Sequence, residues 1–550
     1  MLNLRRGLIL VVVVSATAAG CAFLGSDASD GQNPPPAVPT VSTDVLVCEV
    51  QADQPVGPVP PGVFGTNLEW FNNGTGLVDD RGRLDDRLVR LAGEQGITLV
   101  RFPGGTLSDF YHWKNGIGPQ DRRPTGPHGS DTGRSVNRFG TPELMKFCGQ
   151  IGASPLLTVN VGTGTPEEAA TWVAYCNQPG HAERAADGFP APFGVKLWEV
   201  GNELYLANND VERSITLPPE QYATRFLAFA RAMRAVDPTI SLMAIGTAPS
   251  TRIPISKYEN WSETVLRTAA AEMDYIAVHN AYFPMLIPGR RYETQQVYEA
   301  LWASPESVSR SLTQLAQTIA ANEKGRDIGI AVTEWGIFYS FLDRTWVDQV
   351  KTLGSAVYVG RIMQVFLSHP KVRVANYFKF ADRTFMGWVS YAGETKVSYH
   401  VIELFRKHFG TNLVRVRMDS PTYQTPALGL VPAEDNVPLL TAVASVDKGG
   451  GRLYVNIVSR SWNTVHNVRL SLAGFEPSSS MAKVWAIEGA TVLSNNGRDL
   501  PPGWPWPYVE PEPSKQPIRI SERTVDIAAP IGVQPHSILT IEVAGRMRDE

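Results

Sequence analysis

The sequence predicts an α/β fold: a (β/α)8 TIM barrel followed by an antiparallel β-sandwich domain. Three observations lead to this prediction. Between residues 61 and 410, strand-like apolar runs alternate with helical patterns. Most of these strand runs are continuously apolar, which is typical of a parallel sheet that helices cover on both faces. After residue 411 the helical period ends, and short runs of alternating apolar and polar residues follow.

The barrel region contains eight strand runs, and helical patterns separate them. The strand runs are 62–70, 98–105, 155–162, 195–203, 240–246, 274–282, 329–336 and 372–380. The clearest helical patterns are 85–96, 166–177, 218–238, 350–369 and 398–410. The same alternation also suits a doubly wound open sheet, which is the competing fold. We prefer the barrel, because roughly 350 residues lie within its usual size range.

The region 411–550 is predicted to form the β-sandwich. Its alternating runs are 439–447, 452–461, 466–474 and 537–545. The early strand "TDVLVCEVQ", at 43–51, precedes the barrel and has no helix to pair with. We therefore expect the segment 44–60 to cross over and complete the sandwich. The Pro- and Trp-rich segment 500–517 is expected to be a long loop of this domain.

Residues 1–21 have the three regions of an export signal. Two arginines precede the apolar run Gly7–Val14, and small residues follow, ending at Cys21. The segment "AAGC" resembles a bacterial lipoprotein box, so we predict an exported lipoprotein that is anchored to the membrane through Cys21. Because Ala18 stands where that box prefers Leu, ordinary signal-peptide cleavage and secretion are the alternative. The Ser-, Gly- and Pro-rich residues 22–43 are predicted to be a flexible tether.

The composition is typical of a globular protein. Of 550 residues, 43% are hydrophobic and 19% are charged, and the formal net charge is −4. No basic patch stands out, so no nucleic-acid partner is expected. There is no CxxC pair and no HExxH motif, so neither a metal site nor a cofactor is indicated. A disulfide between Cys148 and Cys176 is one option in an exported protein, but unpaired buried thiols are the favoured interpretation.

Catalytic side chains of a (β/α)8 barrel lie at the carboxyl ends of its strands. Glu203 ends the fourth strand run, and Glu334 lies at the end of the seventh. These strands face one another across the mouth of a closed barrel, so both carboxylates can approach one bond from opposite sides. Hydrolysis of a glycoside requires such a pair, with one carboxyl to protonate the leaving oxygen and one to attack or to activate water. The plainer interpretation of either glutamate alone is a salt-bridged barrel residue.

Sequence motifs make this interpretation more specific. "WEVGNE" and "TEWG" resemble the strand-four and strand-seven segments of the retaining glycoside hydrolases of clan A. The wider sequence is most similar to glycoside hydrolase family 51, the α-L-arabinofuranosidases. The similar segments are "FGTNLE", "RFPGGTLSDFYHW", "VNVGTGTPEEAATWVAYCN", "SYHVIELFRKHFG", "LLTAVASVDKGGGRLYVNIVSRS" and "PHSILTIEV". The resemblance covers nearly all of residues 45–545.

The resemblance implies a retaining, exo-acting hydrolase of arabinose-containing polysaccharides or oligosaccharides, without metal or cofactor. Glu203 would be the acid/base and Glu334 the nucleophile of a double displacement, with the two carboxyl groups about 5–5.5 Å apart. Asn202 would bond the 2-hydroxyl of the sugar, and Tyr282 would orient the nucleophile. Enzymes of this kind often assemble, so a homo-oligomer is one possible state.

The other candidates for the sugar site have two interpretations each. The resemblance implies that Glu69 and Arg101 shape the site, although Arg101 also suits the neutralisation of a buried Glu199. His279 either binds substrate or is simply a satisfied hydrogen-bonding residue. Trp335 either lines the sugar site or packs at the rim of the barrel.

Two departures from the family pattern leave the identity of the sugar open. Thr106 stands where the family usually has Asn, and the spacing from His279 to Tyr282 is wider than in the family. Related clan A β-glucuronidases, β-xylosidases and endo-glycanases therefore remain alternatives. A non-catalytic surface lipoprotein that binds polysaccharide is the alternative from outside the enzymes.

Overall fold

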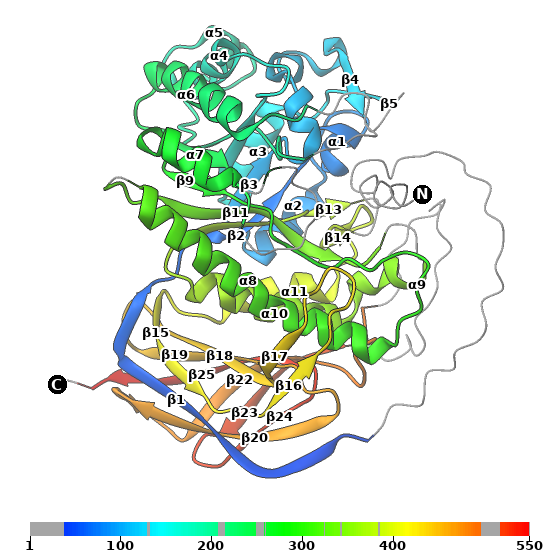
Figure 1. Cartoon of the computed structure of the whole chain (residues 1–550), viewed down its shortest axis with the longest axis vertical. Helices are drawn as coiled ribbons and strands as arrows, with labels where there is room; N and C mark the ends of the chain where they lie inside the picture. Colours follow the sequence, from blue (N-terminus) through cyan, green and yellow to red (C-terminus); the bar gives the residue numbers. More distant parts are fainter. Residues whose placement is uncertain are drawn as a thin grey trace.

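The computed structural model describes residues 38–128, 133–206, 215–248, 258, 260–323, 325–340, 344–382, 386–496 and 518–548. The predicted signal peptide with Cys21, most of the tether and the segment 500–517 lie outside these residues. Among the described residues, no helix is long and apolar enough to cross a membrane. A barrel and a β domain follow one another along the long axis of the molecule (Figure 1).

Eight parallel strands close into a ring. They are β2 (Gly62–Asn67), β3 (Leu99–Phe102), β6 (Ser154–Val159), β7 (Leu197–Val200), β8 (Ser241–Ile245), β9 (Tyr275–Ala277), β11 (Gly329–Phe338) and β12 (Val372–Tyr377). Each strand pairs in parallel with the next, and β12 pairs with β2 to complete the ring. The short strand β10 (Ala281–Pro284) also pairs with β11. The predicted (β/α)8 barrel is confirmed, and the closed ring excludes a doubly wound open sheet.

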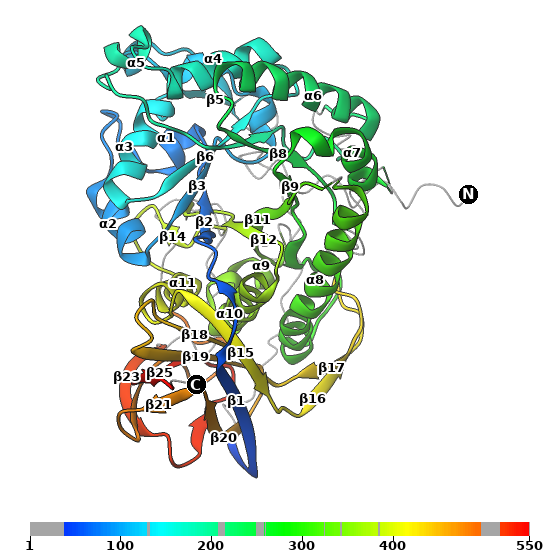
Figure 2. The same ribbon diagram turned by 90° about the vertical axis from the view of Figure 1, so that its left-hand side faces the viewer.

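Helices alternate with these strands and surround the ring (Figure 2). The longer ones are α2 (Asp86–Gln95), α3 (Thr141–Ile151), α4 (Pro166–Asn177), α6 (Pro219–Val236), α7 (Trp261–Ala269), α8 (Thr294–Asn322), α10 (Leu353–Ser368) and α11 (Val397–Lys407). Local chemistry sets their ends. At the start of α2 the Asp85 carboxylate accepts two backbone N–H groups, and Gly96, with φ 76°, ends that helix.

Short elements connect the strands and helices. They are α1 (Phe71–Thr75), η1 (Thr106–Phe110), η2 (Trp113–Gly116), η3 (Gln120–Arg122), β4 (Thr125–His128), β5 (Gly133–Val136), α5 (Ala182–Ala186), η4 (Ala270–Glu272), α9 (Arg344–Val347), η5 (Asp348–Lys351), β13 (Ala381–Asp382) and β14 (Val389–Ser390). Of these, η1 matters most for the site, because it follows directly on β3 at the mouth of the barrel.

The β domain is built on one sheet of ten strands. In sheet order the strands are β23 (Arg519–Asp526), β22 (Met481–Glu488), β25 (Ile538–Met547), β19 (Arg452–Ser459), β18 (Leu440–Val446), β15 (Asn412–Met418), β1 (Thr40–Pro58), β20 (Thr464–Ala473) and β24 (Ile531–Val533), with β21 (Phe475–Pro477) beside β25. A separate pair, β16 (Thr422–Thr425) and β17 (Glu434–Pro438), lies beside α8.

The expected antiparallel sandwich needs one correction. The domain is mostly antiparallel, but β1 pairs in parallel with β20 and antiparallel with β15, and the sheet is continuous. Buried residues from both halves of this sheet, such as Val455 and Val468, share one apolar core. The reason is that β1 precedes the barrel in the sequence and inserts between β15 and β20, which both follow the barrel.

The β domain packs against the helical layer of the barrel. Gln364 of α10 donates a hydrogen bond to Asn456 Oδ1 of β19 (3.0 Å). Arg460, which follows β19, donates to Glu306 of α8 (2.7 Å), and Arg361 of α10 binds the same carboxylate (3.0 Å). Burial raises the pKa of Glu306, but the two arginines outweigh it and bring the pKa down to about 2. A paired carboxylate therefore stabilises the junction of the two domains.

The three cysteines beyond the signal region are buried free thiols, Cys48, Cys148 and Cys176. The interpretation that left Cys148 and Cys176 unpaired is confirmed. Cys48 lies in the apolar core of the β domain, and the other two lie in the core of the barrel.

Candidate active site

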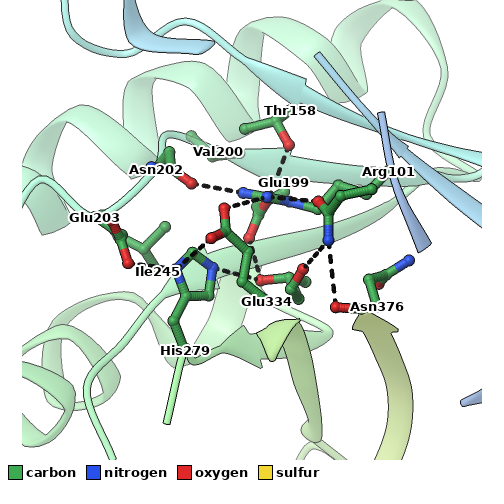
Figure 3. A network of polar contacts seen from close by, with 12 residues as sticks. Arg101, Thr158, Glu199, Val200, Asn202, Glu203, Ile245, His279, Glu334 and Asn376 are labelled. Carbon is green, nitrogen blue, oxygen red and sulfur yellow. Dashed lines mark hydrogen bonds and ion pairs between the residues drawn. The ribbon is translucent and has the colours of Figure 1, made fainter. Parts of the chain in front are cut away.

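Arg101 of β3 lies at the centre of a buried polar network at the mouth of the barrel (Figure 3). Its guanidinium donates from Nε to Glu199 Oε2 (2.5 Å) and from Nη1 to Glu334 Oε1 (2.7 Å). It also donates from Nη2 to Asn202 Oδ1 (2.7 Å) and from Nη1 to Asn67 Oδ1 (2.9 Å). Arg101 has no exposed surface, so it shapes the sugar site through these partners.

Glu199 is the structural partner that the sequence analysis expected for Arg101. It lies on β7 and is fully buried. Besides Arg101, its carboxylate accepts hydrogen bonds from the Thr158 hydroxyl (2.7 Å) and the Thr333 hydroxyl (2.7 Å). A buried carboxylate is tolerated when a cation and hydrogen bonds satisfy its oxygens. The pairing of Glu199 with Arg101 is therefore confirmed.

Glu334 of β11 is held as a charged carboxylate. Its Oε1 accepts from Arg101, and its Oε2 accepts from the Tyr282 hydroxyl (3.0 Å). Burial raises its pKa, but the charges of His279 and Arg101 and the two hydrogen bonds outweigh burial, so the pKa stays below its ordinary value. An ionised, oriented carboxylate is what a glycosidase nucleophile requires.

Glu203 lies just beyond β7 and faces His279. Its Oε1 is 2.7 Å from His279 Nδ1, and His279 Nε2 is 3.0 Å from the Thr333 hydroxyl. That hydroxyl gives its one hydrogen to Glu199, so it must accept from His279 Nε2–H. The hydrogen bond between His279 Nδ1 and Glu203 Oε1 therefore needs a second proton, separate from the one on Nε2.

The charges around His279 favour a proton on its imidazole ring. Burial lowers the pKa of His279, but the charges of Glu334 and Glu203 outweigh it, so the pKa lies above its ordinary value. The site thus keeps an exchangeable proton next to Glu203 Oε1. This arrangement suits a carboxyl that must alternate between acid and base.

The separation of the two glutamates bears on the reaction type. A carboxylate oxygen of Glu203 and one of Glu334 lie within 4.8 Å of each other, and His279 Nδ1 lies 3.8 Å from Glu334 Oε2. Retaining glycosidases hold the two carboxyl groups about 5–5.5 Å apart, and inverting ones about 6.5–9.5 Å. The geometry therefore favours direct attack by one glutamate over activation of an intervening water.

Two further side chains complete the surroundings of the glutamates. Asn202, next to Glu203, uses its Oδ1 to accept from Arg101, and its Nδ2 has no hydrogen-bond partner within the described part of the chain. That amide is therefore available as a donor to a ligand. Tyr282 lies on β10, and its pKa is raised well above the ordinary value by burial and by the charges of Glu334 and Glu203. It remains a hydroxyl donor to Glu334.

Glu69 lies at a second, adjoining cluster. Its carboxylate binds the ammonium group of Lys379, a residue that follows β12. Lys379 Nζ is also 3.4 Å from Asp382 Oδ1. A Cβ added to Gly105 would lie 3.3 Å from Glu69 Oε1, so the "PGG" turn passes close to this carboxylate. Sequence reasoning missed Lys379 and Asp382. The signal was present, because Lys379 is a charged residue at the end of the eighth strand run.

Of the two interpretations of Trp335, the structure shows the one in which it packs and does not line the site. Its ring is fully buried and packs edge-on against Phe366 of α10 (5.3 Å between centroids) and Tyr377 of β12 (5.1 Å). Successive residues of a strand face opposite sides. Since Glu334 points into the mouth of the barrel, Trp335 must point outward to the helices.

A metal ion has one candidate ligand group among the described residues, formed by Glu203, His279 and Glu334. Both ring nitrogens of His279 already bond to protein oxygens, and Glu334 already binds Arg101. A cation here would have to displace these bonds, so the donor set fits a metal poorly.

A closed barrel with two strand-end glutamates at this separation defines a glycoside hydrolase of the retaining type. Two family models match the chain: the α-L-arabinofuranosidase 1 domain over residues 94–280 and the α-L-arabinofuranosidase C-terminal domain over residues 333–503. The chain belongs to glycoside hydrolase family 51, the α-L-arabinofuranosidases, in clan A.

Individual relatives agree with this assignment. The exo-α-(1→6)-L-arabinofuranosidase of Bifidobacterium longum is 26% identical over 461 residues, which are 77% of this chain and 84% of the relative. The α-L-arabinofuranosidase C of Emericella nidulans is 37% identical over 210 residues, or 36% of this chain and 41% of that protein. The crystal structure of the Thermotoga maritima α-L-arabinofuranosidase with arabinose has a similar fold. Its TM-score is 0.75 at 24% identity, covering 91% of this chain and all of that one.

The change Tyr282→Phe tests how the charge of Glu334 is maintained. It removes a hydrogen bond that favours the carboxylate, so the pKa of Glu334 should rise and the acidic limb of kcat/KM should move to higher pH. At the optimum, kcat/KM should fall about 10–100-fold, the loss expected for one hydrogen bond to a charged group. The pH profile on an aryl α-L-arabinofuranoside measures both effects.

Tyr175→Phe is the matched control, because the Tyr175 hydroxyl also donates to a carboxylate, Asp187 (2.7 Å), but lies away from the site. Its profile should keep the limb of the unmodified protein. An acidic limb that stays in place in Tyr282→Phe would contradict the assigned role of this hydrogen bond.

Proposed function

We propose that this α-L-arabinofuranosidase removes terminal arabinofuranosyl groups by double displacement, with Glu334 as nucleophile and Glu203 as acid/base. The observation that carries the proposal is the different environment of two glutamates within one site. Glu334 is locked between Arg101 and Tyr282, whereas Glu203 is partly exposed and shares a proton with His279.

In the first displacement, Glu334 attacks the anomeric carbon while Glu203 passes the proton that it shares with His279 to the glycosidic oxygen. The leaving alcohol departs, and a covalent arabinosyl ester forms on Glu334. Arg101 and Tyr282 set which face of that carboxylate is free for attack. In the second displacement, Glu203 takes a proton from water, the water oxygen attacks the anomeric carbon, and Glu334 leaves as a carboxylate. Two inversions return the starting anomer.

The substrate proposal is a terminal α-L-arabinofuranosyl group of an arabinose-containing polysaccharide or oligosaccharide. The Bifidobacterium longum relatives named for α-(1→6) and α-(1→5) linkages support it, together with the free Nδ2 of Asn202 as a donor to a sugar hydroxyl. A panel of aryl glycosides tests it directly. Release should occur from the α-L-arabinofuranoside, and release only from a β-xyloside or β-glucuronide, or from none of them, would overturn it.

Glu203→Gln should separate good leaving groups from poor ones. Without an acid, kcat/KM for an arabino-oligosaccharide should fall about 10²–10⁴-fold, the usual contribution of general acid–base catalysis. An aryl arabinofuranoside with an activated leaving group needs little protonation, so its kcat/KM should change much less. Steady-state kinetics on the two substrates measure the difference.

Glu168→Gln is a matched control, because Glu168, in the first turn of α4, also pairs with a histidine Nδ1, that of His112 (2.9 Å). It should behave like the unmodified protein on both substrates. Equal losses on both substrates for Glu203→Gln would refute the acid/base role.

We also propose that the enzyme is an exported lipoprotein, held at the membrane through Cys21 and acting on glycans outside the cytoplasm. The support is the signal-like sequence of residues 1–21 and the tether-like composition of residues 22–43 ahead of β1.

Cys21→Ala should remove this anchor. The unmodified protein should incorporate a labelled fatty acid and sediment with membranes, whereas the variant should be unlabelled and soluble. An unlabelled wild-type protein with a mature N-terminus other than Cys21 would instead support ordinary cleavage and secretion.

A further inference from the structure

Asp109 is a buried carboxylate that the reaction scheme leaves without a role. It lies in η1, directly after β3 and the "PGG" turn, and only 3% of its surface is exposed. It borders a small hollow beside the acid/base. Asp109, Asn202 and Glu203 all line that hollow.

Among the described residues, the carboxylate of Asp109 accepts only backbone N–H groups, and these come from two different strand ends. Oδ2 accepts the N–H of Asn202 (3.0 Å), beyond β7. Oδ1 accepts the N–H groups of Val161 (3.0 Å) and Gly162 (3.1 Å), beyond β6. The backbone carbonyl of Asp109 also accepts the Thr163 N–H (3.1 Å). One residue thus ties the turn after β3 to the ends of β6 and β7.

The backbone that Asp109 holds at β7 has an unfavourable conformation. Glu203 has φ 46° and Gly201 has φ 86°, so the chain turns through the left-handed region on both sides of Asn202. A non-glycine residue in this region is strained and persists only where its surroundings hold it. The Asn202 N–H, one residue before Glu203, is fixed by Asp109.

Asp109 is also more than a packing residue. Burial raises the pKa of Asp109 to about 7, with a smaller contribution from the charge of Glu199, while the N–H groups of Asn202, Val161 and Gly162 lower it. A buried carboxylate of this kind is unfavourable unless it is matched by donors. Its charge is stabilised by the same N–H groups that it positions.

We propose that Asp109 is a positioning residue for the acid/base: it fixes the Gly201–Asn202 peptide, directly before Glu203, so that the Asn202 amide and the Glu203 carboxyl face the same glycosidic bond. The inference rests on the proposed role of Glu203. Because the acid must meet a leaving oxygen within hydrogen-bond reach, loss of this positioning should impair protonation far more than attack by Glu334.

The isosteric change Asp109→Asn tests this with little risk to folding. Its amide keeps one acceptor oxygen but turns a donor toward at least one of the N–H groups. We expect kcat/KM on an arabino-oligosaccharide to fall about 10–100-fold, the scale of loss for a displacement near 1 Å. On an activated aryl arabinofuranoside, kcat/KM should fall less than about 3-fold. Asp109→Ala should show the same pattern, and an unfolded Ala variant would leave the decision to Asp109→Asn.

Ser108→Ala is the control, since Ser108 is the preceding residue of the same turn, equally buried, with a hydroxyl that has no partner in the part of the chain described. It should leave both substrates unaffected. The double variant Asp109→Asn with Glu203→Gln gives the sharpest readout. If Asp109 acts through Glu203, the double variant should hydrolyse the oligosaccharide no more slowly than Glu203→Gln alone.

Equal losses on both substrates in Asp109→Asn, no loss at all, or additive effects in the double variant would overturn the inference. These outcomes are distinct from failure of the proposed function. If Glu203→Gln discriminates between the leaving groups and Asp109→Asn does not, only the inference about Asp109 fails. If Glu203→Gln itself shows no discrimination, the role of Glu203 fails first.

Discussion

The site depends on one buried cation, the guanidinium of Arg101. It joins the structural carboxylate Glu199, the nucleophile candidate Glu334 and the amide of Asn202. Two carboxylates this deep in a barrel would repel each other and lose hydration, so neither is stable there without a matched cation. Removing one partner of such a buried set typically costs about 3–5 kcal/mol. The same interaction that makes the barrel mouth stable therefore also fixes the geometry of the reaction.

Around that cation, the two glutamates acquire different chemistry. Arg101 and Tyr282 leave Glu334 charged and rigid, whereas Glu203 lies at the rim with a histidine proton beside it. When two carboxyl groups of one site have surroundings this different, one is suited to act as nucleophile and the other as acid/base. Thr333 links the surroundings of Glu203 to those of Arg101, because its hydroxyl accepts from His279 and donates to Glu199. The protonation of Glu203 is thus connected by hydrogen bonds to the Arg101 cluster.

Much of this arrangement could be predicted from the sequence. The eight strand runs, the strand-end positions of Glu203 and Glu334, and the pairing of Arg101 with Glu199 follow from local patterns and from charge balance. The outward direction of Trp335 also follows from strand alternation, because Glu334 before it points into the mouth of the barrel. The role of Asp109 and the parallel pairing of β1 with β20 could not be predicted in this way. They depend on contacts between segments far apart in the chain, for which one sequence carries no local signal.

The proposed chemistry depends on a covalent arabinosyl intermediate on Glu334 and therefore on retention of the anomeric configuration. The most direct test is the configuration of the product in water containing methanol, because a methyl glycoside cannot equilibrate between anomers. Proton NMR of the product from an aryl α-L-arabinofuranoside should show methyl α-L-arabinofuranoside. Formation of methyl β-L-arabinofuranoside would contradict double displacement.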